Sequence, residues 1–232
     1  MDVGRIKVDS MLKSKHEMPG ITNDSGLNLL WYLAADGIQR ITKRLVDLSM
    51  AFLGLVILTP VMIVVAILIK LDSPGPVIFK QVRCGLGGKS FKMLKFRSMR
   101  TDAEADSGPT WATEDDPRIT RMGGYLRKSR LDEVPQLINV IRGEMSLVGP
   151  RPERPWFVKQ LAQTVPNYQL RHTVKPGITG EAQIFVGYDT CYEDVVRKVQ
   201  HDLSYIRNKG ILHDFKLLAQ TVSIISTGHG AR

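Results

Sequence analysis

Asp132 and Glu133 are adjacent carboxylates in the stretch KSRLDEVPQL, and most of the other charged residues around them are basic. Pro135 lacks a backbone N–H and is therefore expected in the first turn of a helix, which places Asp132 at or beside the helix N-terminus. The positive end of the helix dipole favours an ionised carboxylate there, and it favours a bound phosphate as well. The simplest interpretation is structural, with Asp132 as an N-cap worth about 1 kcal/mol.

The basic neighbours of the pair favour chemistry over capping alone. Arg127 and Arg130 precede it, Arg97 lies in KFRSM, and Arg151 lies in the rigid stretch GPRPERP. A carboxylate among guanidinium groups is expected to have a lowered pKa and to act as a weak nucleophile. Neighbouring helical residues point about 100° apart, so one acid can attack while the other holds a cation. A nucleophile, arginines and Mg²⁺ on hard oxygen ligands are the inventory of phosphoryl transfer.

Composition points to an anionic partner. The 232 residues carry a net charge of +9, which suits a phospholipid surface, a phosphorylated substrate or nucleic acid. The sequence shows no nucleic-acid motif, and its long apolar run argues against that partner. Cys84 and Cys191 are far apart in the sequence, which argues against a disulfide framework or a zinc site. The length predicts one domain with its own core and an appended segment.

The apolar run from Leu48 to Ile69 contains no charged residue. It is long enough for a transmembrane helix, which needs roughly 20 apolar residues. One ordinary spanning helix is the simpler interpretation. Two details favour a re-entrant helix instead, one that enters and leaves by the same face. Thr59-Pro60 is expected to break the helix near its middle. The residues flanking the run are basic on both sides, and basic residues stay cytoplasmic.

The other elements are expected around this anchor. Residues 1–25 should form a tail, and 26–40 a short amphipathic helix with Trp31 and Tyr32 at the interface or in ordinary packing. Two β-rich runs, 77–82 and 90–96, flank a glycine-rich turn and predict a hairpin. The acidic stretch 101–117 is expected to be a solvated loop. Helices are predicted over 119–128, 134–141, 192–208 and 211–226, and loops over LVGPRPERP and VKPGITGEAQI. The last helix is amphipathic and suits a bilayer surface.

Four motifs in order, KFRSM, RLDEVPQL, GEMSLVGPRPE and KPGITGEAQI, resemble the bacterial sugar transferases, which are monotopic phosphoglycosyl transferases. The resemblance runs from about Lys43 to Ile225. It implies an enzyme that transfers sugar-1-phosphate from a UDP-sugar to undecaprenyl phosphate and releases UMP, as the first membrane step of exopolysaccharide or other glycan assembly. The family's membrane segment is re-entrant, which agrees with the argument from the flanks.

The resemblance also assigns roles to residues. Asp132 matches the nucleophile that forms a phosphosugar intermediate, and Glu133 matches the residue associated with Mg²⁺ and proton handling. Both acids are therefore the expected Mg²⁺ ligands. Arg127, Arg151, Lys95 and Arg97 match phosphate-binding or site-flanking cations of the family.

The expected protein is thus α-rich α+β, a monotopic membrane protein with a Pro-broken re-entrant helix, interfacial amphipathic helices and a short β-hairpin. Its parts would be an N-terminal tail and helix (1–40), the membrane helix (41–72) and a catalytic domain (73–232), on the cytoplasmic face of the bacterial inner membrane. A homodimer is compatible with exposed interfacial helices. The sequence departs from the family at Glu181, where a Trp is common. The rival interpretation is a basic membrane-anchored scaffold or binding protein without catalysis, and the sugar is left open.

Overall fold

The computed structural model describes residues 25–105, 108, 110, 116–186 and 192–227, and the chain divides into two units, 1–42 and 43–232. The expected N-terminal tail and Asp106, Glu114, Asp115 and Cys191 lie outside the described residues. The side chains of Trp31 and Tyr32 also lie outside the described part, so their expected interfacial placement stays a prediction.

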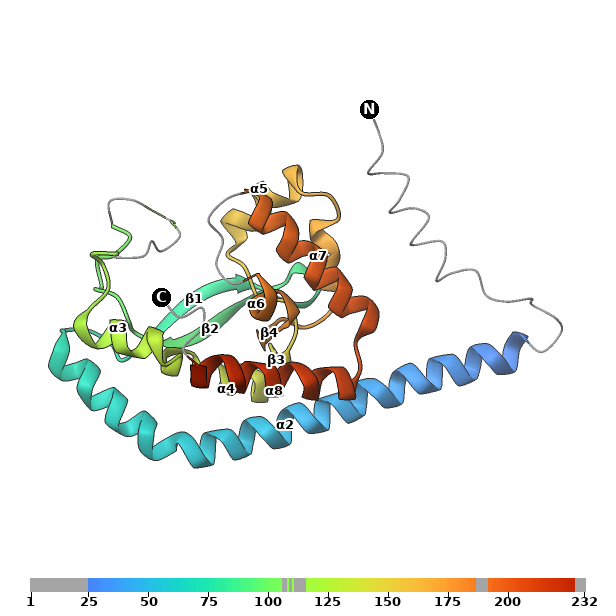
Figure 1. Ribbon diagram of the computed structural model, residues 1–232, viewed down its shortest axis with the longest axis horizontal. Coiled ribbons are helices and arrows are strands. Elements are labelled where there is room, and N and C mark those ends of the chain that lie inside the picture. Colours follow the sequence, from blue (N-terminus) through green and yellow to red (C-terminus); the bar gives the residue numbers. More distant parts are fainter. Residues whose placement is uncertain (1–24, 106–107, 109, 111–115, 187–191, 228–232) are drawn as a thin grey trace. The chain divides into compact units, whose positions relative to one another are not determined.

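Helix α2 comprises Ser25–Asp72 and includes Pro60. The short helix expected over 26–40 is the first part of this element. Pro60 has no N–H to donate to the carbonyl four residues earlier, and the Thr59 hydroxyl donates to the Leu55 carbonyl at 2.6 Å. Figure 1 shows α2 bent within its apolar part. The expected break at Thr59-Pro60 is therefore a bend in a helix that continues to Asp72.

The apolar segment of α2 keeps most of its surface exposed. Gly37–Asp72 is long and apolar enough to cross a membrane, and only 11% of its most apolar window is buried. Phe52, Ile57 and Ile63 are each more than half exposed, with exposed fractions of 65%, 62% and 56%. A helix in the core of a soluble protein would bury such a run, so the structure indicates membrane association.

Both ends of this segment contact the same globular domain. Near its start, Ala51 is fully buried in a core cluster with Val140 and Met145. Asp47 accepts a hydrogen bond from the Ser146 hydroxyl at 2.8 Å. Near its end, Val65 and Ile69 pack with Phe96 and Leu126 in a second cluster. Between these two groups of contacts, Phe52, Ile57 and Ile63 stay exposed.

The predicted hairpin is confirmed. Strands β1 (Ile78–Cys84) and β2 (Ser90–Phe96) pair antiparallel, with Ile78 opposite Phe96 and Cys84 opposite Ser90. The turn between them is a short 3-10 segment, Leu86–Gly88, in which Gly87 has a φ of 64°, a conformation that glycine adopts without strain.

Two stretches that were expected to be loops contain a small parallel sheet. Strand β3 (Ser146–Val148) pairs with β4 (Gly177–Thr179), Ser146 opposite Gly177. A Cβ on Gly177 would lie 2.1 Å from the Gly149 nitrogen, so this approach requires glycine. The sequence signal was weak because each strand has three residues and the pairing joins distant segments.

The remaining elements surround these two sheets. Helices α7 (Tyr192–Asn208) and α8 (Ile211–Thr227) confirm the two predicted C-terminal helices. Helix α5 (Pro155–Thr164), α7 and the 3-10 segment η3 (Tyr168–Thr173) share a core cluster around Val165 and Tyr168. Figure 1 shows α7 over α6, on the other side of the small sheet from α8. The bounds are α3 Arg121–Lys128, η2 Leu131–Glu133, α4 Gln136–Arg142, α5 Pro155–Thr164, η3 Tyr168–Thr173, α6 Glu181–Phe185, α7 Tyr192–Asn208 and α8 Ile211–Thr227.

Candidate active site

The two acids lie in the tight turn η2, directly before α4. Arg130 precedes them with a φ of 56°, a left-handed conformation that is uncommon for residues other than glycine. Pro135, not Asp132, occupies the N-cap position of α4. The predicted placement beside a helix N-terminus is confirmed, whereas the capping role suggested for Asp132 is wrong. A strained turn that presents two acids is typical of a functional site.

Glu133 is held by two cations. Its Oε1 accepts hydrogen bonds from Lys95 Nζ at 3.1 Å and from an Arg151 guanidinium nitrogen at 2.6 Å. Its side chain is only 12% exposed. Burial disfavours the charged form, but Arg151 and Lys95 outweigh it and hold the pKa of Glu133 well below its usual range. The two contacts therefore favour the ionised form of Glu133 and fix its orientation.

Asp132 behaves differently from its neighbour. It is 8% exposed. Burial raises its pKa, the Lys95 ammonium opposes that rise, and the charge of Glu133 adds to it. The expectation of a lowered pKa for Asp132 is therefore wrong. The shortest contacts from Lys95 and Arg151 go to Glu133, so burial is the larger effect at Asp132.

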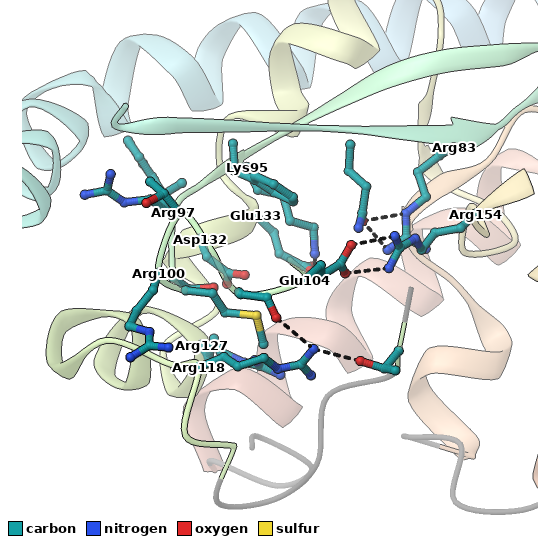
Figure 2. A pocket seen from close by; sticks show the side chains of 18 of the residues that line it. Arg83, Lys95, Arg97, Arg100, Glu104, Arg118, Arg127, Asp132, Glu133 and Arg154 are labelled. Atoms are coloured by element: carbon teal, nitrogen blue, oxygen red, sulfur yellow. Dashed lines mark hydrogen bonds and ion pairs between the residues drawn. The ribbon is translucent and has the colours of Figure 1, made fainter. Parts of the chain in front are cut away.

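The acids line a cavity of about 690 Å³. Figure 2 shows cations around them, with Arg83 and Arg154 on one side and Arg97 and Arg100 on the other. The cavity brings together all the sequence-predicted site residues of the globular domain. Its charged lining residues are Arg83, Lys95, Arg97, Arg100, Glu104, Arg118, Arg127, Arg130, Asp132, Glu133, Arg151, Glu153 and Arg154. Such a lining suits a ligand that carries several negative charges.

Arg83 is a site residue that the sequence did not single out. From the end of β1 it donates to the Pro152 carbonyl at 3.0 Å and to Glu153 Oε2 at 3.2 Å. It thereby holds the loop that carries Arg151 against the hairpin. In the sequence it was only one of several basic residues after the apolar run, because its partners lie about seventy residues further along.

The acidic stretch 101–117 is not simply a solvated loop. Glu104 forms a two-pronged ion pair with Arg154, with N–O distances of 2.6 and 2.7 Å. Asp116 is 5% exposed and pairs with Arg118 through both carboxylate oxygens. Each pair joins an acid of this stretch to an arginine of the cavity lining.

Arg97 lines the cavity, but its terminal nitrogens are bound to the end of α2. They donate to the carbonyls of Pro74 at 2.8 Å and Ser73 at 2.7 Å and to the Ser73 hydroxyl at 2.9 Å. The residue is 4% exposed. A further contact of 3.4 Å joins Arg97 to the Ile69 carbonyl in the last turn of α2, so Arg97 holds the end of the helix and the two residues that follow it.

Glu181, the departure from the family pattern, is not among the residues that line the described cavity. It begins α6 and contacts two histidines, with its Oε1 3.2 Å from His201 Nδ1 and its Oε2 3.5 Å from His213 Nε2. The carboxylate therefore faces α7 and α8. It ties three helices together instead of touching a ligand in the cavity.

Four carboxylates line the cavity; Glu104 and Glu153 are paired with Arg154 and Arg83, and the two acids of η2 are the candidates for holding a metal. Within the described ranges, no group of three or more His, Cys, Asp or Glu residues is arranged to hold an ion. Mg²⁺ does not need such a group, because it usually binds one or two carboxylates and completes its shell with water and substrate phosphates. The two carboxylates, in a cationic cavity of about 690 Å³, fit that habit.

A helix with an exposed apolar run and a cationic cavity that holds two acids suit a class of protein that handles phosphorylated ligands at a membrane. The family model for bacterial sugar transferases matches residues 38–228, and the chain belongs to that family.

Its relatives include UDP-N-acetylgalactosamine-undecaprenyl-phosphate N-acetylgalactosaminephosphotransferase of Aeromonas hydrophila, 41% identical over 99% of this chain and 51% of the relative. UDP-glucose:undecaprenyl-phosphate glucose-1-phosphate transferase of Escherichia coli is 46% identical over 80% of this chain and 40% of the relative. The exopolysaccharide production protein PSS of Rhizobium leguminosarum is 41% identical over 82% of this chain and 98% of the relative. The chain spans about half of the length of the first relative and 40% of the length of the second.

Proposed function

We propose that this protein transfers sugar-1-phosphate from a UDP-sugar to undecaprenyl phosphate and releases UMP, at the cytoplasmic face of the bacterial inner membrane. The observation that carries the proposal is the pair of buried acids in a cationic cavity of about 690 Å³, one of them held ionised by Lys95 and Arg151. The activities for which the relatives from Aeromonas hydrophila and Escherichia coli are named support the reaction class and the acceptor.

The proposed reaction has two steps. A carboxylate oxygen of Asp132 attacks the β-phosphorus of the donor, and the bond from that phosphorus to the bridging oxygen breaks. UMP leaves with the electron pair, and a phosphosugar remains on Asp132. A phosphate oxygen of the lipid then attacks the same phosphorus and displaces the Asp132 carboxylate. A covalent intermediate lets the soluble nucleotide leave before the membrane-bound acceptor reacts.

The surrounding side chains supply charge and orientation. Arg127 lies in α3 and lines the cavity, where it would neutralise a donor phosphate. Arg151 and Lys95 fix Glu133, and they can shift toward the charge that develops on the phosphoryl oxygens. We propose that Arg97 holds the end of α2 and does not bind a phosphate, because its terminal nitrogens already donate to Ser73 and Pro74.

Mg²⁺ is the proposed cofactor, with Asp132 and Glu133 as its protein ligands. When bound, it would neutralise charge on the diphosphate of the donor. Glu133 suits this role because it stays ionised at every physiological pH.

The re-entrant topology is part of the proposal. Its support is that both ends of the apolar segment contact one globular domain, through Ala51 and Asp47 at the start and Ile69 at the end. A helix that crossed the bilayer would carry its two ends to opposite faces, roughly 30 Å apart. The bend at Pro60 allows the segment to dip into one leaflet and return. The cavity would then lie at headgroup depth, where a polyprenyl phosphate presents its anion.

Intact-protein mass spectrometry tests the chemistry. The solubilised protein would be incubated with Mg²⁺ and a panel of UDP-sugars, without lipid acceptor, alongside Asp132→Asn. We expect a sugar-phosphate adduct on the wild type that is absent from the variant, and the mass of the adduct identifies the sugar. Turnover with undecaprenyl phosphate but no adduct would exclude the covalent route. Turnover retained in Asp132→Asn would exclude Asp132 as the nucleophile and favour a binding or scaffold role for the pair.

Cysteine labelling tests the topology. Arg40→Cys and Lys70→Cys, placed on either side of the apolar run in a background with Cys84→Ser and Cys191→Ser, would be treated with a membrane-impermeant maleimide. We expect both positions to react only in inverted vesicles, where the cytoplasmic face is outside. Reaction of the two positions from opposite faces would show a spanning helix.

A further inference from the structure

The loop that carries Arg151 is held from behind by a buried ion pair. Pro150 and Pro152 flank Arg151 and have no N–H groups to donate. The Arg151 carbonyl accepts a hydrogen bond from an Arg171 guanidinium nitrogen at 3.0 Å. Arg171 in turn lies 2.7 Å from an oxygen of Asp202, in α7. The chain of contacts therefore runs from α7 through Arg171 to the backbone from which Arg151 reaches Glu133.

The two terminal nitrogens of Arg171 contact three partners. Besides the Arg151 carbonyl and Asp202, its guanidinium donates to the Tyr168 hydroxyl at 2.8 Å. The side chains of Arg171 and Asp202 are 9% and 2% exposed. Burial alone would lower the pKa of Arg171, but Asp202 and the other acceptors raise it, so the charge is kept. A planar fork with several donors can join three partners at once, which a lysine ammonium does less well.

Arg171 does not line the cavity of about 690 Å³; it lines a neighbouring pocket of only about 40 Å³, together with Arg151 and Glu153. The two ends of the chain of contacts differ in this respect. Arg151 lines the cavity and its side chain contacts Glu133 at 2.6 Å, whereas Arg171 contacts Arg151 at the backbone carbonyl. A change at Arg171 can reach the chemistry through the position of Arg151.

We infer that Arg171, with Asp202 as its counter-ion, is a positioning residue that sets the placement of Arg151 and through it the orientation of Glu133. The inference rests on the proposed function. A shift of 1 Å in a group of this kind can cost about 10²-fold in rate. We therefore expect Arg171→Lys, which keeps the charge but loses the fork, to lower kcat/KM by up to that factor.

A double-mutant cycle separates positioning from general support of the fold. The variants are Arg151→Lys, Arg171→Lys and the double variant, assayed for kcat/KM with the donor that the wild type uses. If Arg171 acts through Arg151, the kcat/KM of the double variant should lie within about twofold of that of the less active single variant. Once Arg151 is replaced, Arg171 no longer has that side chain to position, so its own replacement adds little. The matched control pairs Arg171→Lys with Arg127→Lys. Arg127 lines the same cavity from α3, so the two losses should multiply.

The outcomes are distinct. Coupling to Arg151 together with multiplication at Arg127 supports the inference. Losses that multiply in both pairs, in step with a lower midpoint of thermal unfolding, overturn it and leave Arg171 as a residue of the fold. If Arg171→Lys does not fold, Asp202→Asn keeps the shape of the pair and enters the same cycle. A wild type with no turnover on any UDP-sugar removes the proposed function as well, whereas an active wild type with multiplying losses removes this inference alone.

Discussion

Replacing Arg97 by Met tests whether this residue holds the end of α2 or a substrate phosphate. Met fills a similar volume but cannot donate, so the carbonyls of Ser73 and Pro74 lose their partners. Each hydrogen bond to a charged group contributes about 1.5–3 kcal/mol, and neighbouring bonds do not add fully. We expect a loss of about 4 kcal/mol in the free energy of unfolding. For a protein of this size that corresponds to about 10 °C in the midpoint of thermal unfolding.

The assay is thermal unfolding in lipid nanodiscs, with the KM for the donor measured below the midpoint. Arg100→Met is the matched control, since Arg100 lies three residues further along and lines the same cavity. Its side chain is 61% exposed in a pair with Asp102, and such pairs contribute about 1 kcal/mol or less. We expect the midpoint to fall only in Arg97→Met, with an unchanged KM in the folded protein. An unchanged midpoint with a KM raised tenfold would refute the capping role and restore Arg97 as a phosphate ligand.

Three further predictions concern packing and pH. Gly123→Ala should lower the free energy of unfolding by about 2–3 kcal/mol, because the added Cβ would lie 1.9 Å from the Ser98 backbone oxygen. Gly124→Ala has open space around the added Cβ and should be stabilising. Chemical denaturation compares the two variants, and equal effects would contradict the packing. Lys95→Met removes the cation that opposes the raised pKa of Asp132, so the acid limb of the kcat/KM profile should move to higher pH. An unmoved limb would show that another group is titrating. Because the pKa of Glu133 is lower in the folded than in the unfolded protein, its ionised form stabilises the fold above the unfolded pKa of about 4.5, and this stability is lost as the pH falls toward the folded pKa. The midpoint of thermal unfolding should therefore fall less steeply below pH 4.5 in Glu133→Gln than in the wild type. Parallel slopes would count against the ion pairs.

The elements that the sequence predicted correctly carry strong local signals. The hairpin has two β-rich runs around a glycine turn, and the helix over Tyr192–Asn208 has the bounds expected from its pattern. The apolar run is visible in composition alone. The acid pair could also be found, because Pro135 marks a helix start and the neighbouring residues are basic. Each of these signals lies within a few consecutive residues.

The different environments of the two acids follow only from the tertiary structure. Asp132 and Glu133 are neighbours in the sequence and look alike there, but Lys95 arrives from β2 and Arg151 from the loop after β3, and both contact Glu133. Burial, a property of the whole fold, then raises the pKa of Asp132 while these contacts lower that of Glu133. A sequence without distances cannot say which acid receives the cations.

The sequence by itself determined the inventory of this protein: an apolar helix with a proline, an acid pair, and enough arginine and lysine for a phosphorylated ligand. The tertiary structure decided the assignments. Arg97 contacts the segment at the end of α2, Glu181 contacts histidines of α7 and α8, and Arg171 contacts the backbone of Arg151. Local sequence sets backbone preference and hydrophobic pattern, whereas the partner of a charged side chain depends on which distant segments the fold brings within about 3 Å.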